Sequence, residues 1–159
     1  MAKKVEPKKQ DGPKRVDNRR ARYDYAIEEA LEAGVSLLGS EVKSLFQGKA
    51  NLTDSYCLVK GGEMWLMNLD IEPYDKASVF QHERRRDRKL LLHRKEIEVL
   101  ARKVQEKGFA LIPLAMYFKN GKVKVEIGLG RGKASYDKRD AIAKNETRRE
   151  QERLRSGRL

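Results

Sequence analysis

The chain has 159 residues, a single cysteine and a formal net charge of +12. This length predicts one domain with extensions, and a lone Cys57 excludes an internal disulfide, as expected of a protein in the reducing cytoplasm. No run approaches the roughly 18 apolar residues of a membrane span, and the basic start leads into no apolar segment of a secretion signal.

The positive charge is concentrated at the two ends of the chain. Residues 1–22 carry nine Lys/Arg and three Asp/Glu, and residues 131–159 carry ten and five. Residues 23–130 carry seventeen and sixteen, and are therefore close to neutral. This distribution is typical of a domain that docks on a polyanion, above all nucleic acid, because clustered cations release counterions from phosphates. The alternative is that both ends are merely solvated.

The first segments give mixed signals. Residues 1–17 are rich in Lys, Pro, Asp and Gly, so we expect them to be disordered. Residues 23–39 are ambiguous. Tyr25, Ile27 and Leu31 alternate as in a half-buried strand, whereas the Ala and Glu content favours a helix.

A short helix is expected next. Gly34 should break the preceding segment and a second strand should follow over Val35–Leu38. Ser40 is the expected N-cap, and Gly48 can end the helix in a left-handed conformation. Three apolar residues share one face of this helix: Val42, Leu45 and Phe46.

A hairpin signal occupies the middle of the chain. The runs Tyr56–Val59 and Met64–Ile71 flank Gly61 and Gly62, a pair suited to a tight turn. We expect a charged loop to follow, and it contains Arg84, Arg85, Arg86, Arg88 and Lys89.

The last elements are the clearest. Ile97, Leu100 and Val104 line one face of a helix that Gly108 can stop. The runs 111–118 and 123–129 then flank Asn120 and Gly121, which tolerate the positive φ angles of a type I′ turn. From Arg131 onward, apolar residues are scarce, so this tail should be unfolded or marginally helical without a partner.

Signals for catalysis, metals or cofactors are weak. Cys57 lies in an apolar run and should be an inert core thiol, whereas His82 and His93 lack partners at metal-ligand spacing. The glycines in 128–133 do not have P-loop spacing and are expected to release the last strand into a mobile arm. The acidic run 28–32 is typical of a solvated face. We therefore expect no catalytic residue, metal or cofactor.

Seven strings, in order along the chain, resemble one family. They are NRRAR (18–22), EAG (32–34), EVKSL (41–45), GKANLTDSY (48–56), RKLLLH (88–93), YFKNG (117–121) and DKR (137–139). Each is weak alone, but the ordered set resembles the SsrA-binding proteins, known as SmpB.

The resemblance implies a mainly β fold with short helices. The expected architecture is an OB-like closed antiparallel β-barrel, with two to three helices packed on it and flexible basic tails. It implies three parts: a disordered arm (1–17), an RNA-binding barrel (18–130) and a basic tail (131–159) that becomes ordered, mostly as helix, on the ribosome. It also favours a strand for the ambiguous residues 23–33.

The resemblance implies a non-catalytic activity in ribosome rescue. Proteins of this family bind the tRNA-like domain of tmRNA (SsrA RNA) and deliver it, as alanyl-tmRNA with elongation factor Tu and GTP, to stalled ribosomes. Trans-translation then tags the incomplete peptide for degradation. The expected protein is a cytoplasmic monomer without a membrane partner.

The resemblance also implies the contact residues of the body. Glu32 would accept hydrogen bonds from base edges or orient an Arg, and Leu91 would pack on a splayed base. Their alternatives are a solvent-facing strand residue and ordinary core. The full set of expected tmRNA contacts is Asn18, Arg20, Arg22, Tyr25, Glu32, Lys43, Lys49, Asn51, Tyr56, Lys89 and Leu91.

The tail is expected to occupy the decoding site and the empty mRNA channel of the small ribosomal subunit. An aromatic ring flanked by cations can stack on a ribosomal base. Two positions depart from the family pattern: Ala134, where many relatives have Lys, and Leu154, which is followed by Arg155 and not by a second apolar residue. The expected contacts are Gly132, Lys133, Tyr136, Asp137, Lys138, Arg139, Arg148, Arg149 and Arg153.

Two alternatives remain open from the sequence. A generic ribosome-associated or single-strand RNA-binding OB module would bind many RNAs, because stacking and phosphate contacts are sequence-tolerant. An RNA-processing enzyme would need a metal or nucleophile constellation, which the sequence does not offer.

Overall fold

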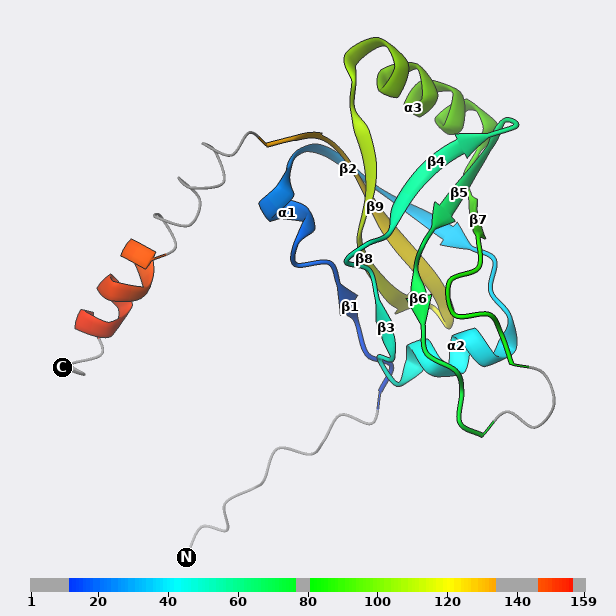
Figure 1. Cartoon of the computed structure of the whole chain (residues 1–159), viewed down its shortest axis with the longest axis horizontal. Coiled ribbons are helices and arrows are strands. Elements are labelled where there is room, and N and C mark those ends of the chain that lie inside the picture. The colour runs from blue at the N-terminus through cyan, green and yellow to red at the C-terminus, as the bar shows by residue number, and fades with distance from the viewer. Residues whose placement is uncertain (1–11, 77–80, 134–145, 156–159) are drawn as a thin grey trace, which may run out of the picture.

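The computed structural model describes residues 12–76, 81–133 and 146–155. The fold is mainly β, as predicted, and a further helix spans 146–155 (Figure 1). In chain order the other elements are β1 (Val16–Asp17), α1 (Ala21–Asp24), β2 (Tyr25–Val35), α2 (Gly39–Phe46), β3 (Ala50–Asn51), β4 (Tyr56–Lys60), β5 (Glu63–Met67), β6 (Asp70–Ile71), β7 (Arg88–Leu91), α3 (Arg94–Lys107), β8 (Ala110–Lys119) and β9 (Lys122–Gly132).

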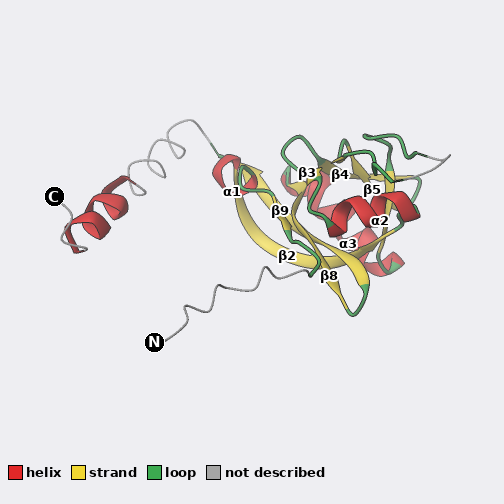
Figure 2. Cartoon of the chain, turned by 90° about the horizontal axis from the view of Figure 1, so that it is seen from below, coloured by secondary structure: helices red, strands yellow, loops and turns green. Residues whose placement is uncertain are grey.

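Six antiparallel strands pair in a ring. Their order is β8-β4-β5-β7-β2-β9, β9 pairs back onto β8, and β1 lies on the edge of β8. Helices α3 and α2 lie at opposite ends of this ring (Figure 1), and Figure 2 shows β2, β8 and β9 as one strongly curved sheet. Within the described residues, the seam between β4 and β8 is a single pair, Cys57 with Leu111.

Strand β2 resolves residues 25–33 of the ambiguous segment in favour of a strand, whereas Tyr23 and Asp24 belong to helix α1. The register with β9 shifts between Ile27 and Glu29, so a bulge interrupts the alternation of side chains. Before the bulge, Tyr25 and Ile27 pack with Ala21 in a small outer cluster. After it, Leu31 packs against the main core inside the ring. The Ala and Glu content favoured a helix, because composition does not record which side chains lie on each face of a sheet.

The expected break at Gly34 and the strand over Val35–Leu38 are wrong. Strand β2 runs without interruption to Val35 because Gly34 pairs with both neighbouring strands, β7 and β9. Helix α2 then begins at Gly39 with Leu38 at the N-cap, so Ser40 lies inside the helix. The Glu41 carboxylate accepts a hydrogen bond from the Leu38 amide at 2.8 Å, and this contact replaces the expected serine cap.

The turns were predicted correctly. Gly61 and Gly62 have φ angles of 61° and 75°, and Asn120 and Gly121 have 52° and 75°. The expected strand Met64–Ile71 is interrupted, however. Asn68 has a φ angle of 62°, so β5 ends at Met67 and the chain turns to pair β6 with β3.

Helix α3 is also confirmed, with Ile97 and Leu100 buried and Gly108 in the left-handed region at a φ angle of 65°. His93 is its N-cap residue, although its side chain makes no capping hydrogen bond. Among the residues that the structure describes, no helix is long and apolar enough to cross a membrane.

The glycines of 128–132 lie within β9 and do not release it. A Cβ at Gly130 would lie 2.5 Å from the carbonyl oxygen of Ala26, and one at Gly128 would lie 3.0 Å from Leu114. Both glycines therefore permit β2 and a β8 side chain to approach β9 closely. Pairing continues to Gly132, which lies opposite Tyr25.

The expected charged loop ends earlier than predicted, because Arg88 and Lys89 belong to β7. Arg88 is fully buried, as is Glu41 of α2. The Arg88 Nε donates to Glu41 at 2.5 Å, and its two terminal nitrogens donate to four carbonyl oxygens, those of Leu69, Glu83, Arg84 and Arg86. All five guanidinium donors are therefore satisfied, as a buried charge requires.

Glu41 is held ionised in this network. Burial alone would raise the pKa of its carboxyl, but hydrogen bonds from Arg86 and the Leu38 amide, together with the charge of Arg88, outweigh burial and lower the pKa. A folded-state pKa below the unfolded value adds stability that is present above the unfolded pKa and is lost as the pH falls.

We predict that Glu41→Gln lowers the free energy of unfolding by about 3–5 kcal/mol, because it leaves buried Arg88 without its counter-charge. Wild-type stability should also fall as the pH drops below about 4.3, the usual pKa of Glu. The variant has no carboxyl at position 41, so it should not show this part of the pH dependence. Urea unfolding followed by Trp65 fluorescence measures both effects.

The matched control is Glu98→Gln. Glu98 pairs with Arg94 at 3.5 Å on the exposed face of α3, so its loss should cost less than about 0.5 kcal/mol. Equal effects of the two substitutions would contradict a structural role for the buried pair.

Candidate nucleic-acid interface

The residues predicted to contact RNA fall mainly into three groups. The first group lines a pocket beside α1, which we call the α1 pocket, and consists of Asn18, Arg20, Tyr25 and Tyr56. The second group lines a depression over β2 and β7, which we call the β2 depression, and consists of Glu32, Lys89 and Leu91. The third group surrounds the C-terminal end of α2 and consists of Lys43, Lys49 and Asn51.

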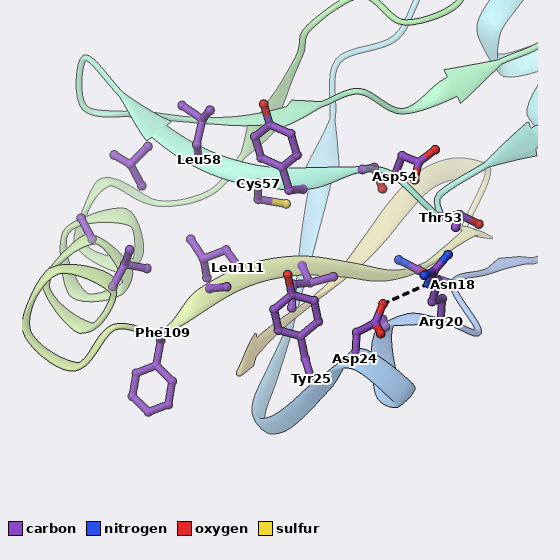
Figure 3. A pocket seen from close by; sticks show the side chains of 18 of the residues that line it. Asn18, Arg20, Asp24, Tyr25, Thr53, Asp54, Cys57, Leu58, Phe109 and Leu111 are labelled. Carbon is purple, nitrogen blue, oxygen red and sulfur yellow. Dashed lines mark hydrogen bonds and ion pairs between the residues drawn. The ribbon is translucent and has the colours of Figure 1, made fainter. Parts of the chain in front are cut away.

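The α1 pocket has a volume of about 710 Å³ and lies between α1, α3 and the first residues of β4 and β8. In Figure 3 the ring of Tyr25 projects toward the strand that carries Cys57 and Leu58. Tyr56, also in its lining, is 47% exposed. Arg20 is held on the wall by Asp24, with 3.1 Å between Nε and Oδ2. Aromatic rings beside a cation can stack on unpaired bases.

Asn18 is buried, so its main contacts are structural. Its amide nitrogen donates to the carbonyl oxygens of Leu52 at 3.2 Å and Pro113 at 2.9 Å. Its side-chain oxygen is buried without a hydrogen-bond partner. Asn18 therefore joins the N-terminal segment to β8 and to the loop after β3, and forms the inner wall of the α1 pocket.

The β2 depression has a volume of about 620 Å³. Gly34 lines it and lies opposite Leu91 on β7 and Lys124 on β9. Leu91 is 55% exposed, so its alternative interpretation as ordinary core does not hold. Lys89 lines the same depression, with its Nζ 3.0 Å from Glu63.

Glu32 is exposed on β2, but other side chains fix its position. Its carboxylate accepts a short hydrogen bond from the Tyr117 hydroxyl, and the Lys119 Nζ lies 3.3 Å from the other oxygen. The hydrogen bond from Tyr117 lowers the pKa of the Glu32 carboxyl, and the charges of Lys119 and Lys124 act in the same direction. The same bond raises the pKa of Tyr117 to about 12. The result is a fixed, ionised carboxylate with cations around it.

The third group lies around the end of α2. Lys43 lies over the ring of Tyr74, with 5.3 Å between Nζ and the ring centroid. The Lys49 amide donates to Ser44 at the helix end, and the Asn51 side chain accepts from the Thr53 amide at 2.8 Å. Cations at a helix C-terminus are favoured by its dipole and are available to phosphates.

The start of the predicted tail is attached to the folded body at α1. Gly132 pairs with Tyr25, the Lys133 amide donates to Asp24 at 2.8 Å, and the Lys133 Nζ donates to the carbonyl oxygen of Arg22 at 2.9 Å. The Arg22 main chain is thus occupied within the protein, while its side chain is exposed.

The rest of the tail is only partly described. Arg148, Arg149 and Arg153 lie on the exposed helix 146–155, where Arg148 is 3.8 Å from Glu152. Four of the predicted decoding-site residues lie outside the described residues: Tyr136, Asp137, Lys138 and Arg139.

The described part of the chain offers no metal site, and its cysteine is buried. Residues 12–76, 81–133 and 146–155 contain no cluster of three metal-ligating side chains. Cys57 is buried, and burial raises the pKa of its thiol. The buried ring of His82 instead bridges Ser40 at 2.9 Å and the Ile71 carbonyl at 3.0 Å.

Three residues at or next to Glu32 were not among the contacts predicted from the sequence: Tyr117, Lys119 and Arg15. Alternation along 111–118 is the signal that could have placed Tyr117 on the outer face, because Met116 and Phe118 pack in the core. Arg15 lies over the Tyr117 ring at 5.1 Å. The sequence predicts disorder over residues 1–17, whereas Val16 and Asp17 form strand β1 on β8, and this pairing brings Arg15 to Tyr117.

We predict that Glu32→Gln brings the pKa of Tyr117 down from about 12 toward the usual value near 10, because a neutral amide no longer stabilises the protonated phenol. Phenolate absorbance against pH measures this shift. Tyr117→Phe lacks this phenol, so its comparison with wild type shows which part of the absorbance change belongs to Tyr117. Glu29→Gln, which removes the carboxylate paired with Lys103, should leave it in place. An unshifted Tyr117 in Glu32→Gln would contradict the bond.

Comparison with known proteins gives the same family throughout. The family model "SmpB protein" matches residues 15–156. The SsrA-binding protein of Symbiobacterium thermophilum is 53% identical over 144 residues, 90% of this chain and 91% of that protein. That of Thermobifida fusca is 52% identical over 154 residues, 96% of each.

A solved structure agrees. A chain described under "tmRNA-SmpB: a journey to the center of the bacterial ribosome" has a TM-score of 0.65 and 47% identity, with 80% of this chain and 94% of that one covered. The ordered motifs, the mainly β ring and these matches lead to one conclusion: the chain belongs to the SmpB family of SsrA-binding proteins.

Proposed function

We propose that this protein binds the tRNA-like domain of tmRNA and acts with it on stalled ribosomes in trans-translation. It contributes binding rather than catalysis, and it works in the cytoplasm. The observation that carries the proposal is the family match across residues 15–156, together with a 47% identical relative described with tmRNA and the ribosome.

The geometry of the body supports an RNA surface with two kinds of contact. The α1 pocket offers the partly exposed rings of Tyr25 and Tyr56 beside Arg20, which suits stacking on unpaired bases. The β2 depression offers a fixed carboxylate, an exposed leucine and Lys124, which suits the reading of a base edge. Lys43 and Lys49 would add phosphate contacts.

The basic tail would act separately from this surface. We propose that residues 131–159 enter the decoding site and the empty mRNA channel, and that elongation factor Tu with GTP accompanies the complex. The arginines of 146–155 are exposed, so phosphates can reach them. The division into an arm, a body and a tail, with boundaries near residues 17 and 130, is part of this proposal.

We predict that Glu32→Arg weakens tmRNA binding by at least about tenfold, or 1.4 kcal/mol, because it removes the acceptor and breaks the contact with Tyr117. RNA retained on the purified protein measures this. Wild type should keep one dominant species with a tRNA-like end and an internal reading frame at moderate salt. Glu29→Arg, on the face that meets α3, is the control.

If wild type instead retains a mixture of ribosomal and messenger RNA that washes off with salt, tmRNA specificity is refuted in favour of phosphate-driven binding. If Glu32→Arg binds tmRNA normally, Glu32 does not belong to the site.

We predict that alanines at Asp137, Lys138 and Arg139 leave tmRNA affinity within about threefold, or 0.6 kcal/mol, but stop peptide tagging on stalled ribosomes. In this proposal the tail acts after tmRNA has bound. A reconstituted tagging reaction measures it, with alanines at Lys8 and Lys9 as a control that removes the same number of cations. Normal tagging by the tail variant would refute the tail's role.

A further inference from the structure

The end of strand β9 is fastened to helix α1, on whose side of the body it lies (Figure 1). Gly132, the last residue of β9, pairs with Tyr25 at the start of β2. Beyond it, the Lys133 amide donates to the carbonyl oxygen of Asp24 at 2.8 Å. The Lys133 Nζ donates to the carbonyl oxygen of Arg22 at 2.9 Å. Lys133 therefore holds α1 with both its main chain and its side chain.

The carbonyl oxygens that Lys133 meets lie at the C-terminal end of a short helix. Helix α1 has four residues, and within it the Ala21 carbonyl accepts from the amide of Tyr25. The last carbonyl oxygens of a helix have no N–H group ahead of them in the helix, and a nearby lysine commonly donates to them. Lys133 plays this part from a strand that lies more than a hundred residues further along the chain.

Helix α1 is itself fixed to the body, so a residue bonded to it is fixed as well. Ala21 is buried and packs against Leu114 of β8. The Asn18 amide donates to the Leu114 carbonyl oxygen at 2.8 Å, just before the helix. Across the helix, the Arg20 Nε lies 3.1 Å from the Asp24 carboxylate.

A second cation holds the strand end two residues earlier. The Arg131 guanidinium lies over the ring of Phe109, with 4.6 Å between its central carbon and the ring centroid. Phe109 is buried in the connection from α3 to β8. A cation on the face of a buried ring is a stabilising contact. Arg131 and Lys133, on either side of Gly132, thus fasten the strand end at two points.

The sequence predicts a different role for Lys133, as a contact in the decoding site. The two roles differ in when the ammonium acts. An RNA contact matters only on the ribosome, whereas a bond to α1 acts in the free protein, before any RNA is present. This difference makes the roles separable by experiment.

We propose that Lys133 is a positioning residue for the basic tail: its amide and ammonium fasten the end of β9 to α1, so that the tail leaves the body at one fixed point. A fixed exit removes conformations that would otherwise be lost when the tail docks, and it keeps the tail near its target. This inference rests on the proposed function, because a fixed exit is useful only if the tail has a target on the ribosome.

The first readout is the mobility of a nitroxide label on Ala134→Cys in the free protein. Cys57 is buried and the pKa of its thiol is raised, so the reagent modifies the introduced cysteine. The spectrum should contain an immobilised component, and Lys133→Met should lose it. Lys133→Arg should restore it, because a guanidinium can donate to the same carbonyl. Lys138→Met, which removes a cation beyond the anchor, should retain it.

The second readout is peptide tagging on stalled ribosomes with saturating tmRNA, so that tmRNA affinity does not limit the reaction. Lys133→Met should tag about fivefold less efficiently, because the residues that Lys133 no longer holds must be ordered on docking. Lys133→Arg should tag as well as wild type. Lys107→Met, which removes an exposed cation at the end of α3, is the control and should also tag normally.

The two readouts together decide the inference. An immobilised label that persists in Lys133→Met overturns it, and weaker tagging by that variant would then assign Lys133 to direct contact with RNA. A mobile label with normal tagging overturns it too, since the fixed exit would have no use. Failure of wild type to tag refutes the proposed function instead, while the label still reports whether Lys133 anchors the strand end.

Discussion

The fold depends on a buried guanidinium. A charge without water must find partners for every donor, and Arg88 finds five: Glu41 on α2 and the carbonyl oxygens of Leu69, Glu83, Arg84 and Arg86. These contacts fix the register of β7, because a slip by one residue would turn Lys89 inward. The same register places Leu91 beside Gly34 and Lys89 beside Glu63. The surface that faces RNA in our proposal is thus positioned by a charge at the opposite side of the same strand.

Elements with local signals were predictable from the sequence. The glycine pair at 61–62, Asn120 with Gly121 and the apolar face of α3 needed only neighbours within a few residues. The bulge in β2, the uninterrupted pairing at Gly34 and the burial of Arg88 depend on partners far along the chain. Most Arg-rich runs are exposed to solvent, so composition predicts that every arginine of such a run is exposed. It could not show that Arg88 is buried. The family resemblance identified candidate contact residues, but not which of them lie together or that Asn18 is buried.

The candidate surface is divided, and its parts differ in chemistry. The α1 pocket carries aromatic rings and lies where β9 leaves the body, whereas the β2 depression carries a carboxylate and lies across β9, β2 and β7. Both chain ends touch these parts: Arg15 lies over Tyr117, and Lys133 is bonded to the main chain of α1. The near-neutral body is therefore not charge-poor. Several of its cations, such as Arg88, Lys89 and Lys103, are held in ion pairs, while the net excess of positive charge belongs to the sequence ends.

The narrow seam of the ring has a chemical consequence. Strands β4 and β8 meet at Cys57 and Leu111, so an adduct on this buried thiol would disturb the one pair that joins them within the described residues. Oxidants and alkylating agents attack the thiolate, however, and the buried thiol stays protonated because its pKa is raised. The seam should therefore tolerate peroxide at concentrations that inactivate proteins with exposed low-pKa cysteines.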